Sequence, residues 1–73
     1  MGINIRIVRK GHGSKKVLAE LYNANPLELP IKTETINVDG FEERVLSVTK
    51  VYEYNKHNLL DNVYDCWFEV DVT

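Results

Sequence analysis

Residues 64–72 read Tyr64-Asp65-Cys66-Trp67-Phe68-Glu69-Val70-Asp71-Val72 and show the clearest alternation in the chain. Its even positions carry mainly apolar side chains, whereas its odd positions carry three acids and one Trp. A period of two is typical of a β-strand that rests one face against a core. We therefore expect an extended strand with an apolar face and an acidic face.

Two other stretches repeat this alternation. In residues 3–7, isoleucines alternate with Asn4 and Arg6. In residues 45–54, one face would carry the even positions, which are Leu46, Val48, Lys50, Tyr52 and Tyr54. Both stretches predict half-buried strands.

The middle of the chain predicts a hairpin and two irregular segments. Residues 31–38 are rich in Thr, Ile and Val and end at Asp39-Gly40, a strong hairpin signal because both residues tolerate a positive φ. Residues 55–62 are mostly polar and indicate a loop between the last two strands. Pro26 and Pro30 bracket a segment that should be extended or irregular, because proline lacks a backbone donor.

Residues 14–24 fit two structures. As a helix, the segment would use Ser14 as its N-cap, and its Leu, Ala, Glu and Lys residues favour that conformation. As a strand, it would pair with the first stretch across a turn at Gly11-His12-Gly13. We adopt the strand, which gives a mainly β fold: a small five-stranded antiparallel meander curled into a barrel-like roll. The alternative is an α+β fold, an antiparallel sheet with one helix at about 14–24.

Length and composition limit the class of protein. The 73 residues fit one domain, and a hydrophobic fraction of 44% supports one core. We find no apolar run near the ~20 residues that span a bilayer, no signal-peptide pattern and only one cysteine, Cys66. We therefore expect a cytoplasmic protein without disulfides or a membrane partner. Because the core is small, self-association into a homo-oligomer would be a natural supplement.

Charge is strongly segregated along the chain. Residues 1–16 contain five basic residues and no acid, whereas the rest holds four basic residues and all eleven acids. The basic tip could contact phosphate or nucleic acid through Arg9, Lys10, His12, Lys15 and Lys16. The plainer interpretation is a solvated hairpin tip whose charges prevent aggregation of an edge.

The acidic face of residues 64–72 is the other candidate site. An exposed Trp beside carboxylates would anchor a basic protein partner, and the residues concerned are Asp65, Trp67, Glu69 and Asp71. The alternative is that Trp67 packs beneath the 55–62 loop or the proline-bracketed segment, with the acids on a wet face.

Catalysis has little support in the sequence. Cys66 lies on the apolar face, which favours an inert core thiol over a nucleophile paired with His12 or His57. No common metal-ligand spacing is present, so we expect no catalytic residue, metal or cofactor. Tyr52, Tyr54 and Tyr64 could form a stacking platform for nucleic-acid bases, but the face that Tyr52 and Tyr54 share with Leu46 and Val48 favours a core or half-core position.

Together these features predict a non-enzymatic protein-binding module. It would act as a small regulator or inhibitor of a larger protein, of a size typical of chains encoded by phages or mobile elements. The partner would engage the acidic face or an open sheet edge by strand addition. The alternatives are a nucleic-acid-binding module that uses the basic tip and a structural subunit of a homo-oligomer.

Overall fold

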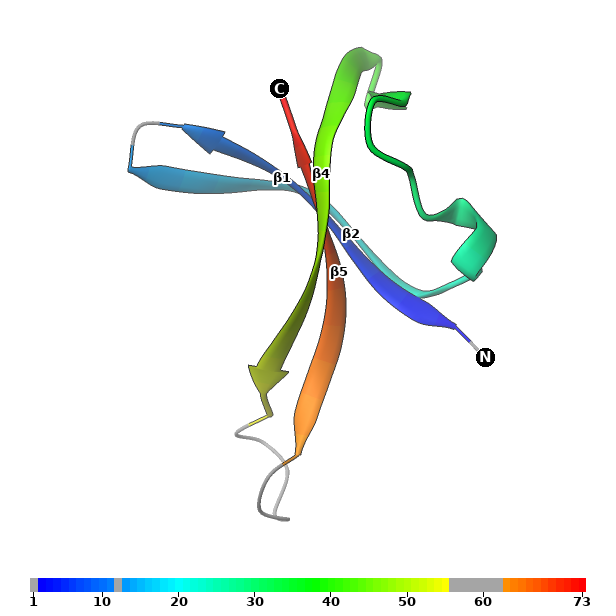
Figure 1. Ribbon diagram of the computed structural model, residues 1–73, viewed down its shortest axis with the longest axis vertical. Helices are drawn as coiled ribbons and strands as arrows, with labels where there is room; N and C mark the ends of the chain where they lie inside the picture. The colour runs from blue at the N-terminus through cyan, green and yellow to red at the C-terminus, as the bar shows by residue number, and fades with distance from the viewer. Residues whose placement is uncertain (1, 12, 56–62) are drawn as a thin grey trace.

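The computed structural model describes residues 2–11, 13–55 and 63–73. Five strands and one 3₁₀ turn follow one another along the chain: β1 (Ile3–Gly11), β2 (Ser14–Ala24), η1 (Pro26–Glu28), β3 (Thr35–Val38), β4 (Phe41–Tyr54) and β5 (Tyr64–Val72). The strands form a five-stranded mixed sheet that is nearly closed into a barrel, which confirms the mainly β, barrel-like fold (Figure 1). Among the described residues, no helix has the length and apolar character needed to cross a bilayer.

The pairing of the strands differs from the expected antiparallel meander. The sheet order is β2-β1-β5-β4-β3, and β1 pairs with β5 in parallel. The chain leaves β2 through the segment around η1, builds the β3–β4 hairpin on the far side of the sheet, and returns through β5 between β4 and β1. Alternation in a sequence predicts a strand but does not say which strand will be its neighbour.

Residues 14–24 form strand β2, as the predicted turn before them indicated, despite their helical propensities. Gly13 has a φ of 73°, a conformation that glycine adopts without strain, and Gly11 pairs with Ser14 across the two-residue turn. Further along, Ile5 pairs with Leu21, so the ribbon places apolar side chains on its inner face. The helix alternative is therefore wrong, because cross-strand packing overrides intrinsic propensity.

The hairpin predicted at Asp39-Gly40 is present. Asp39 and Gly40 have φ values of 52° and 87°, as a two-residue turn of the type favoured in hairpins requires. The Asn37 side chain accepts a hydrogen bond from the Gly40 N–H at 2.9 Å and fixes the turn. Val38 and Phe41 are the cross-strand partners that flank it.

The core occupies the inner face of the sheet. Its buried members come from β1, β2, β4 and β5: Ile5, Ile7, Ala24, Val45, Val70 and Val72. A register shift between Val45 and Ser47 turns Val45 inward and leaves Leu46 exposed. The expectation that Leu46 shares the buried face is thus wrong, because one bulge residue reverses the alternation.

Candidate functional site

Trp67, the expected anchor of a partner, is buried. It is 6% exposed, and the Tyr22 ring meets its indole edge-on at a centroid distance of 5.2 Å. The Arg6 guanidinium lies 4.2 Å from the centroid of the same indole, a cation–π contact. The interpretation of Trp67 as an exposed binding residue is wrong. Arg6 from β1 and Tyr22 from β2 contact the indole. Of the loop predicted at residues 55–62, positions 56–62 lie outside the described residues.

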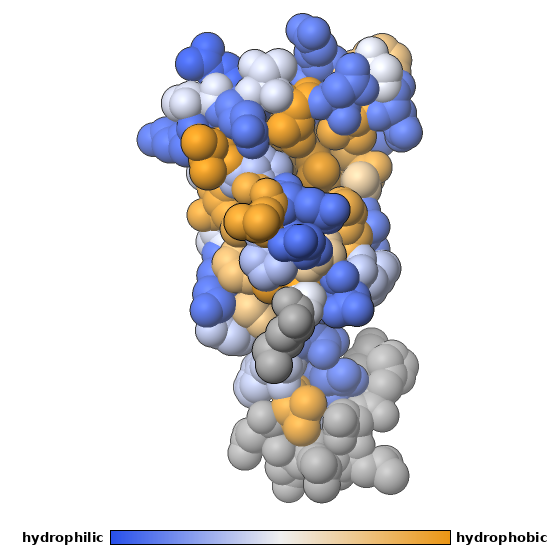
Figure 2. Space-filling view, turned by 90° about the vertical axis from the view of Figure 1, so that its right-hand side faces the viewer, coloured by the Kyte–Doolittle hydropathy of each residue, from blue (hydrophilic) through white to orange (hydrophobic). Residues whose placement is uncertain are grey.

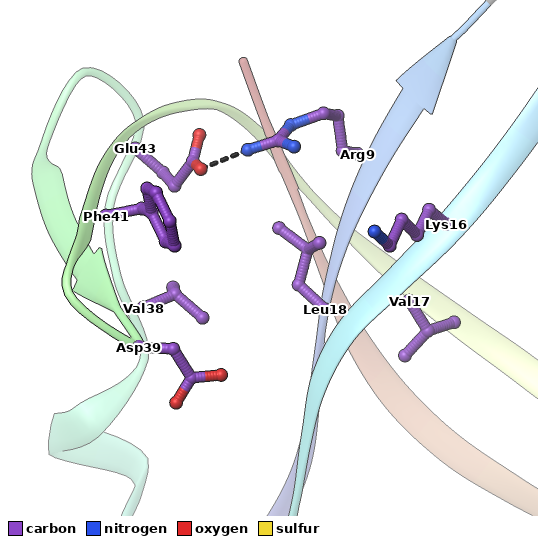
Figure 3. Close-up of a pocket in the computed structure, with 8 residues that line it drawn as sticks. All are labelled: Arg9, Lys16, Val17, Leu18, Val38, Asp39, Phe41 and Glu43. Carbon is purple, nitrogen blue, oxygen red and sulfur yellow. Dashed lines mark hydrogen bonds and ion pairs between the residues drawn. The ribbon is translucent and has the colours of Figure 1, made fainter.

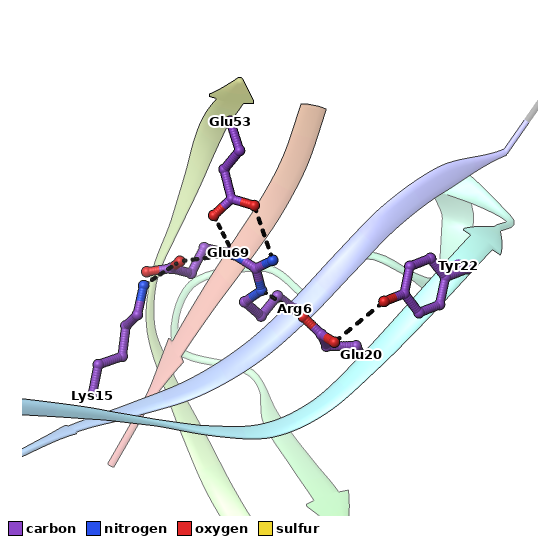
Figure 4. Close-up of polar contacts among 6 residues, drawn as sticks. All are labelled: Arg6, Lys15, Glu20, Tyr22, Glu53 and Glu69. Carbon is purple, nitrogen blue, oxygen red and sulfur yellow. Dashed lines mark hydrogen bonds and ion pairs between the residues drawn. The ribbon is translucent and has the colours of Figure 1, made fainter. Parts of the chain in front are cut away.

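Arg6 is the centre of a group of ion pairs that joins four strands (Figure 4). Its Nε donates to Glu20 at 2.8 Å, and its Nη1 donates to Glu53 at 2.8 Å and lies 4.0 Å from Glu69. The Arg6 side chain is only 11% exposed. We call Arg6, Glu20, Glu53 and Glu69 the Arg6 network.

Arg6 and Glu53 shift each other's pKa. The hydrogen bond to Glu53 raises the pKa of Arg6 further above its ordinary value, against the opposing effect of burial. The same hydrogen bond lowers the pKa of Glu53 below its ordinary 4.5. Both groups therefore stay charged at neutral pH, which suits a structural role.

The basic tip lies over the acids of β5. Lys15 Nζ donates to Glu69 at 3.1 Å, and Lys10 Nζ lies 3.9 Å from Asp71. Glu69 is buried and Asp71 is half-buried. The expectation of an open acidic face is therefore wrong for both residues, because the cations of the N-terminal hairpin cover it. Asp65 alone of the four is exposed, and it accepts a hydrogen bond from the Asn55 side chain at 3.4 Å.

The remaining residues of the tip have different surroundings. Arg9 forms an ion pair with the buried Glu43, and its Nε donates to the Thr73 carbonyl at 3.0 Å. Lys16 is exposed, and no carboxylate of the described residues forms an ion pair with it. His12 lies outside the described residues.

A groove of about 410 Å³ lies between β2 and the β3–β4 hairpin (Figure 3). β2 and β3 are the two ends of the sheet, so the groove marks the seam where the barrel is not closed. We call it the seam groove. It is lined by Arg9, Lys16, Val17, Leu18, Val38, Asp39, Phe41 and Glu43.

The seam groove has apolar side chains in its walls, and β3, which supplies Val38 to the groove, also has a free backbone edge at Thr35. Leu18 from β2 faces Val38 and Phe41 from the hairpin (Figure 3). On β3, the N–H of Val45 donates to the carbonyl of Glu34, which makes Thr35 and its partner Arg44 a non-hydrogen-bonded pair. The N–H and C=O of Thr35 therefore point away from β4, toward the open edge.

The seam groove was not predictable from the sequence alone. The sequence analysis predicts an open sheet edge but not which strands form it, because that depends on the order of the strands in the sheet. Figure 2, seen from the side of η1 and β3, shows hydrophobic groups scattered among charged ones on this face. Phe41, directly after the predicted turn, lines the groove and is 69% exposed. A large aromatic residue beside a hairpin turn was the available signal.

Tyr52 and Tyr54, expected in a core or half-core position, are at the surface, as is Tyr64. Tyr52, Tyr54 and Tyr64 are each more than half exposed, and the rings of Tyr54 and Tyr64 meet edge-on at 5.6 Å. The cause is the length of the β4–β5 ribbon, which extends beyond the part that β1 and β2 cover (Figure 1). Cys66, opposite Tyr52, is half-buried.

The described residues contain no group of three or more His, Cys, Asp or Glu side chains placed to hold a metal ion. His57 lies outside those residues. In comparisons with known proteins, no family model matches the sequence, and no curated protein and no solved structure matches it. The candidate site therefore rests on geometry alone.

Proposed function

We propose that this protein is a binding module that takes up an extended segment of a partner protein in the seam groove by strand addition. The observation that carries the proposal is the position of the groove, a cleft lined by both apolar and charged side chains between the two edge strands of a nearly closed barrel. An added strand would gain backbone hydrogen bonds from an edge and would place alternate side chains in the groove. We expect the module to act in the cytoplasm as a small regulator or inhibitor of its partner.

One feature of β3 and two features of the groove support an extended ligand. The outward N–H and C=O of Thr35 offer the start of a ladder. Phe41, Val38 and Leu18 offer apolar surface to every second side chain of a strand. The groove sits between two edges, so one added strand would cover exposed apolar surface and an unpaired edge together.

The nucleic-acid alternative has less support. Binding to a phosphate backbone depends on cations that are free to neutralise it. Arg9, Lys10 and Lys15 already face carboxylates of their own chain. Among the described tip residues, that leaves Lys16.

The proposal is tested by selecting a displayed library of random ten-residue peptides against the protein. The matched variants are Phe41→Ser and Ile31→Ser, because both side chains are 69% exposed but only Phe41 lines the groove. We expect selected peptides to lose at least about tenfold in affinity for Phe41→Ser, since a large apolar contact is worth roughly 1.5–3 kcal/mol. Affinity for Ile31→Ser should be unchanged. Equal affinity for both variants would place binding elsewhere.

A second variant tests the backbone edge. Thr35→Pro removes an N–H that β4 does not use, so the hairpin should persist while an added strand loses one donor. Circular dichroism checks the fold, and peptide affinity is measured by fluorescence anisotropy. Unchanged affinity in a folded Thr35→Pro would argue against strand addition on β3. A second copy as occupant would instead appear as a concentration-dependent dimer in sedimentation.

A further inference from the structure

The cations of the N-terminal hairpin form two like-charged cross-strand pairs. Arg9 lies opposite Lys16, and Lys10 lies opposite Lys15. Like charges directly opposite one another destabilise a sheet unless nearby acids compensate them. The chain supplies such acids for three of the four: Glu43 for Arg9, Asp71 for Lys10 and Glu69 for Lys15. Within the described residues, Lys16 is the cation left without a carboxylate.

Lys16 stands at the seam groove. Figure 3 shows its ammonium group directed toward the space between the two walls, next to Leu18. The other cation of the groove, Arg9, is already neutralised by Glu43. Asp39, on the opposite wall, adds a negative charge that disfavours an acid at its own end of the groove. The field in the groove is therefore positive near Lys16 and negative near Asp39.

Resting on the proposed function, we propose that the segment bound in the seam groove carries a carboxylate side chain that pairs with Lys16. A bulky apolar side chain lies two residues away on the same face of that segment and packs against Leu18, Val38 and Phe41. Alternate residues of a strand lie about 7 Å apart on one face, so the two contacts require the spacing acid, any residue, apolar residue. The partner is thus an extended acidic-apolar peptide, and the two charges of the groove set its direction.

The test uses an array of capped seven-residue peptides in which Thr alternates with Glu, Gln, Lys, Leu or Phe. The array is probed with the wild-type protein, with Lys16→Glu and with Lys32→Glu, a control that reverses an exposed lysine outside the groove. We expect the tightest wild-type ligands to carry Glu two positions from Leu or Phe. Replacing that Glu by Gln should weaken binding by about threefold, as for a partly exposed ion pair. Lys16→Glu should reverse the preference from Glu to Lys, and Lys32→Glu should leave it unchanged.

The outcomes separate this inference from the proposed function. If the wild-type protein binds peptides in a manner that Phe41→Ser abolishes, but Glu, Gln and Lys are equivalent, the carboxylate pairing is wrong and strand addition stands. A preference for Glu that persists in Lys16→Glu would also overturn the pairing. If no extended peptide binds the wild-type protein, both proposals are overturned.

Discussion

The Arg6 network, together with Trp67, and the seam groove both combine charged and aromatic side chains. Arg6 and Trp67 are largely buried, whereas Lys16 and Phe41 in the seam groove are exposed. In the Arg6 network, a cation that is 11% exposed meets three carboxylates from three other strands, and Trp67 is sealed beneath it. In the seam groove, Lys16 and Phe41 remain exposed between two strands that end the sheet. Charge and aromatic surface therefore stabilise the fold on one face and remain available to a ligand at the other.

The largest effect is expected from Trp67→Ala. Removing a buried Trp side chain costs about 3–5 kcal/mol, an amount comparable with the whole stability of a chain this short. The variant should be largely unfolded by circular dichroism at 25 °C. Tyr64→Ala, which truncates an exposed ring on the same strand, should change the urea midpoint little. Equal stability of the two variants would contradict the burial of Trp67 beneath Arg6 and Tyr22.

The next effect is expected from Arg6→Met, which keeps the length of the side chain and removes its charge. Three carboxylates then lose their common cation, with Glu69 buried and the other two partly exposed. We expect the free energy of unfolding in urea to fall by about 2–3 kcal/mol, less than for a fully buried pair. Arg44→Met removes an exposed arginine for which no ion pair is found among the described residues, and it should cost under about 0.5 kcal/mol. Equal losses would contradict a special role for Arg6.

A smaller effect concerns pH. The pKa of Glu53 is lowered in the folded protein by its hydrogen bond to Arg6, so the carboxylate stabilises the fold above its unfolded pKa near 4.5. That contribution is lost as the pH falls from about 4.5 through the lower folded pKa. Stability measured from pH 7 down to pH 3 should therefore decline less steeply in Glu53→Gln than in the wild type. Parallel pH profiles would show that Glu53 is not coupled to Arg6.

The smallest effect distinguishes two adjacent lysines. Lys15 contacts the buried Glu69, whereas Lys16 faces the seam groove. Lys15→Gln should lower the free energy of unfolding by about 0.5–1 kcal/mol, the range of a partly exposed ion pair. Lys16→Gln should leave stability unchanged, because its charge has no carboxylate partner among the described residues. A larger loss of thermal stability in Lys16→Gln than in Lys15→Gln would contradict the roles assigned to the two lysines.

Much of the fold was predictable because its strands have clear periods and its turns have specific residues. Residues 64–72 and the Asp39-Gly40 turn form the elements that their patterns predict. The parallel neighbour of β5 and the bulge after Val45 were not predictable, since both depend on which strands meet in three dimensions. A single bulge residue moved Leu46 to the surface.

The site was less predictable for the same reason. The segregation of charge along the sequence indicated two separate binding surfaces. Because β1 and β5 are neighbours in the sheet, the basic and acidic stretches neutralise each other instead. The alternation correctly assigned the odd and even positions of β5 to opposite faces. The exposure of the odd-numbered side chains, however, depends on β2, whose Lys15 and Tyr22 contact Glu69 and Trp67. Trp67 shows the consequence, because an aromatic residue among acids indicated an anchor and became part of the interior.

The N-terminal hairpin closes over the acid-bearing side of the last strand, and Trp67 lies beneath it. Trp67 is the only Trp in the chain, so acrylamide quenching of its fluorescence reports on that closure directly. We predict emission blue-shifted from that of the urea-unfolded chain and a quenching constant several-fold lower in the native protein. Equal quenching in the native and unfolded states would mean that the indole faces solvent. That result would contradict the closure of the N-terminal hairpin over β5.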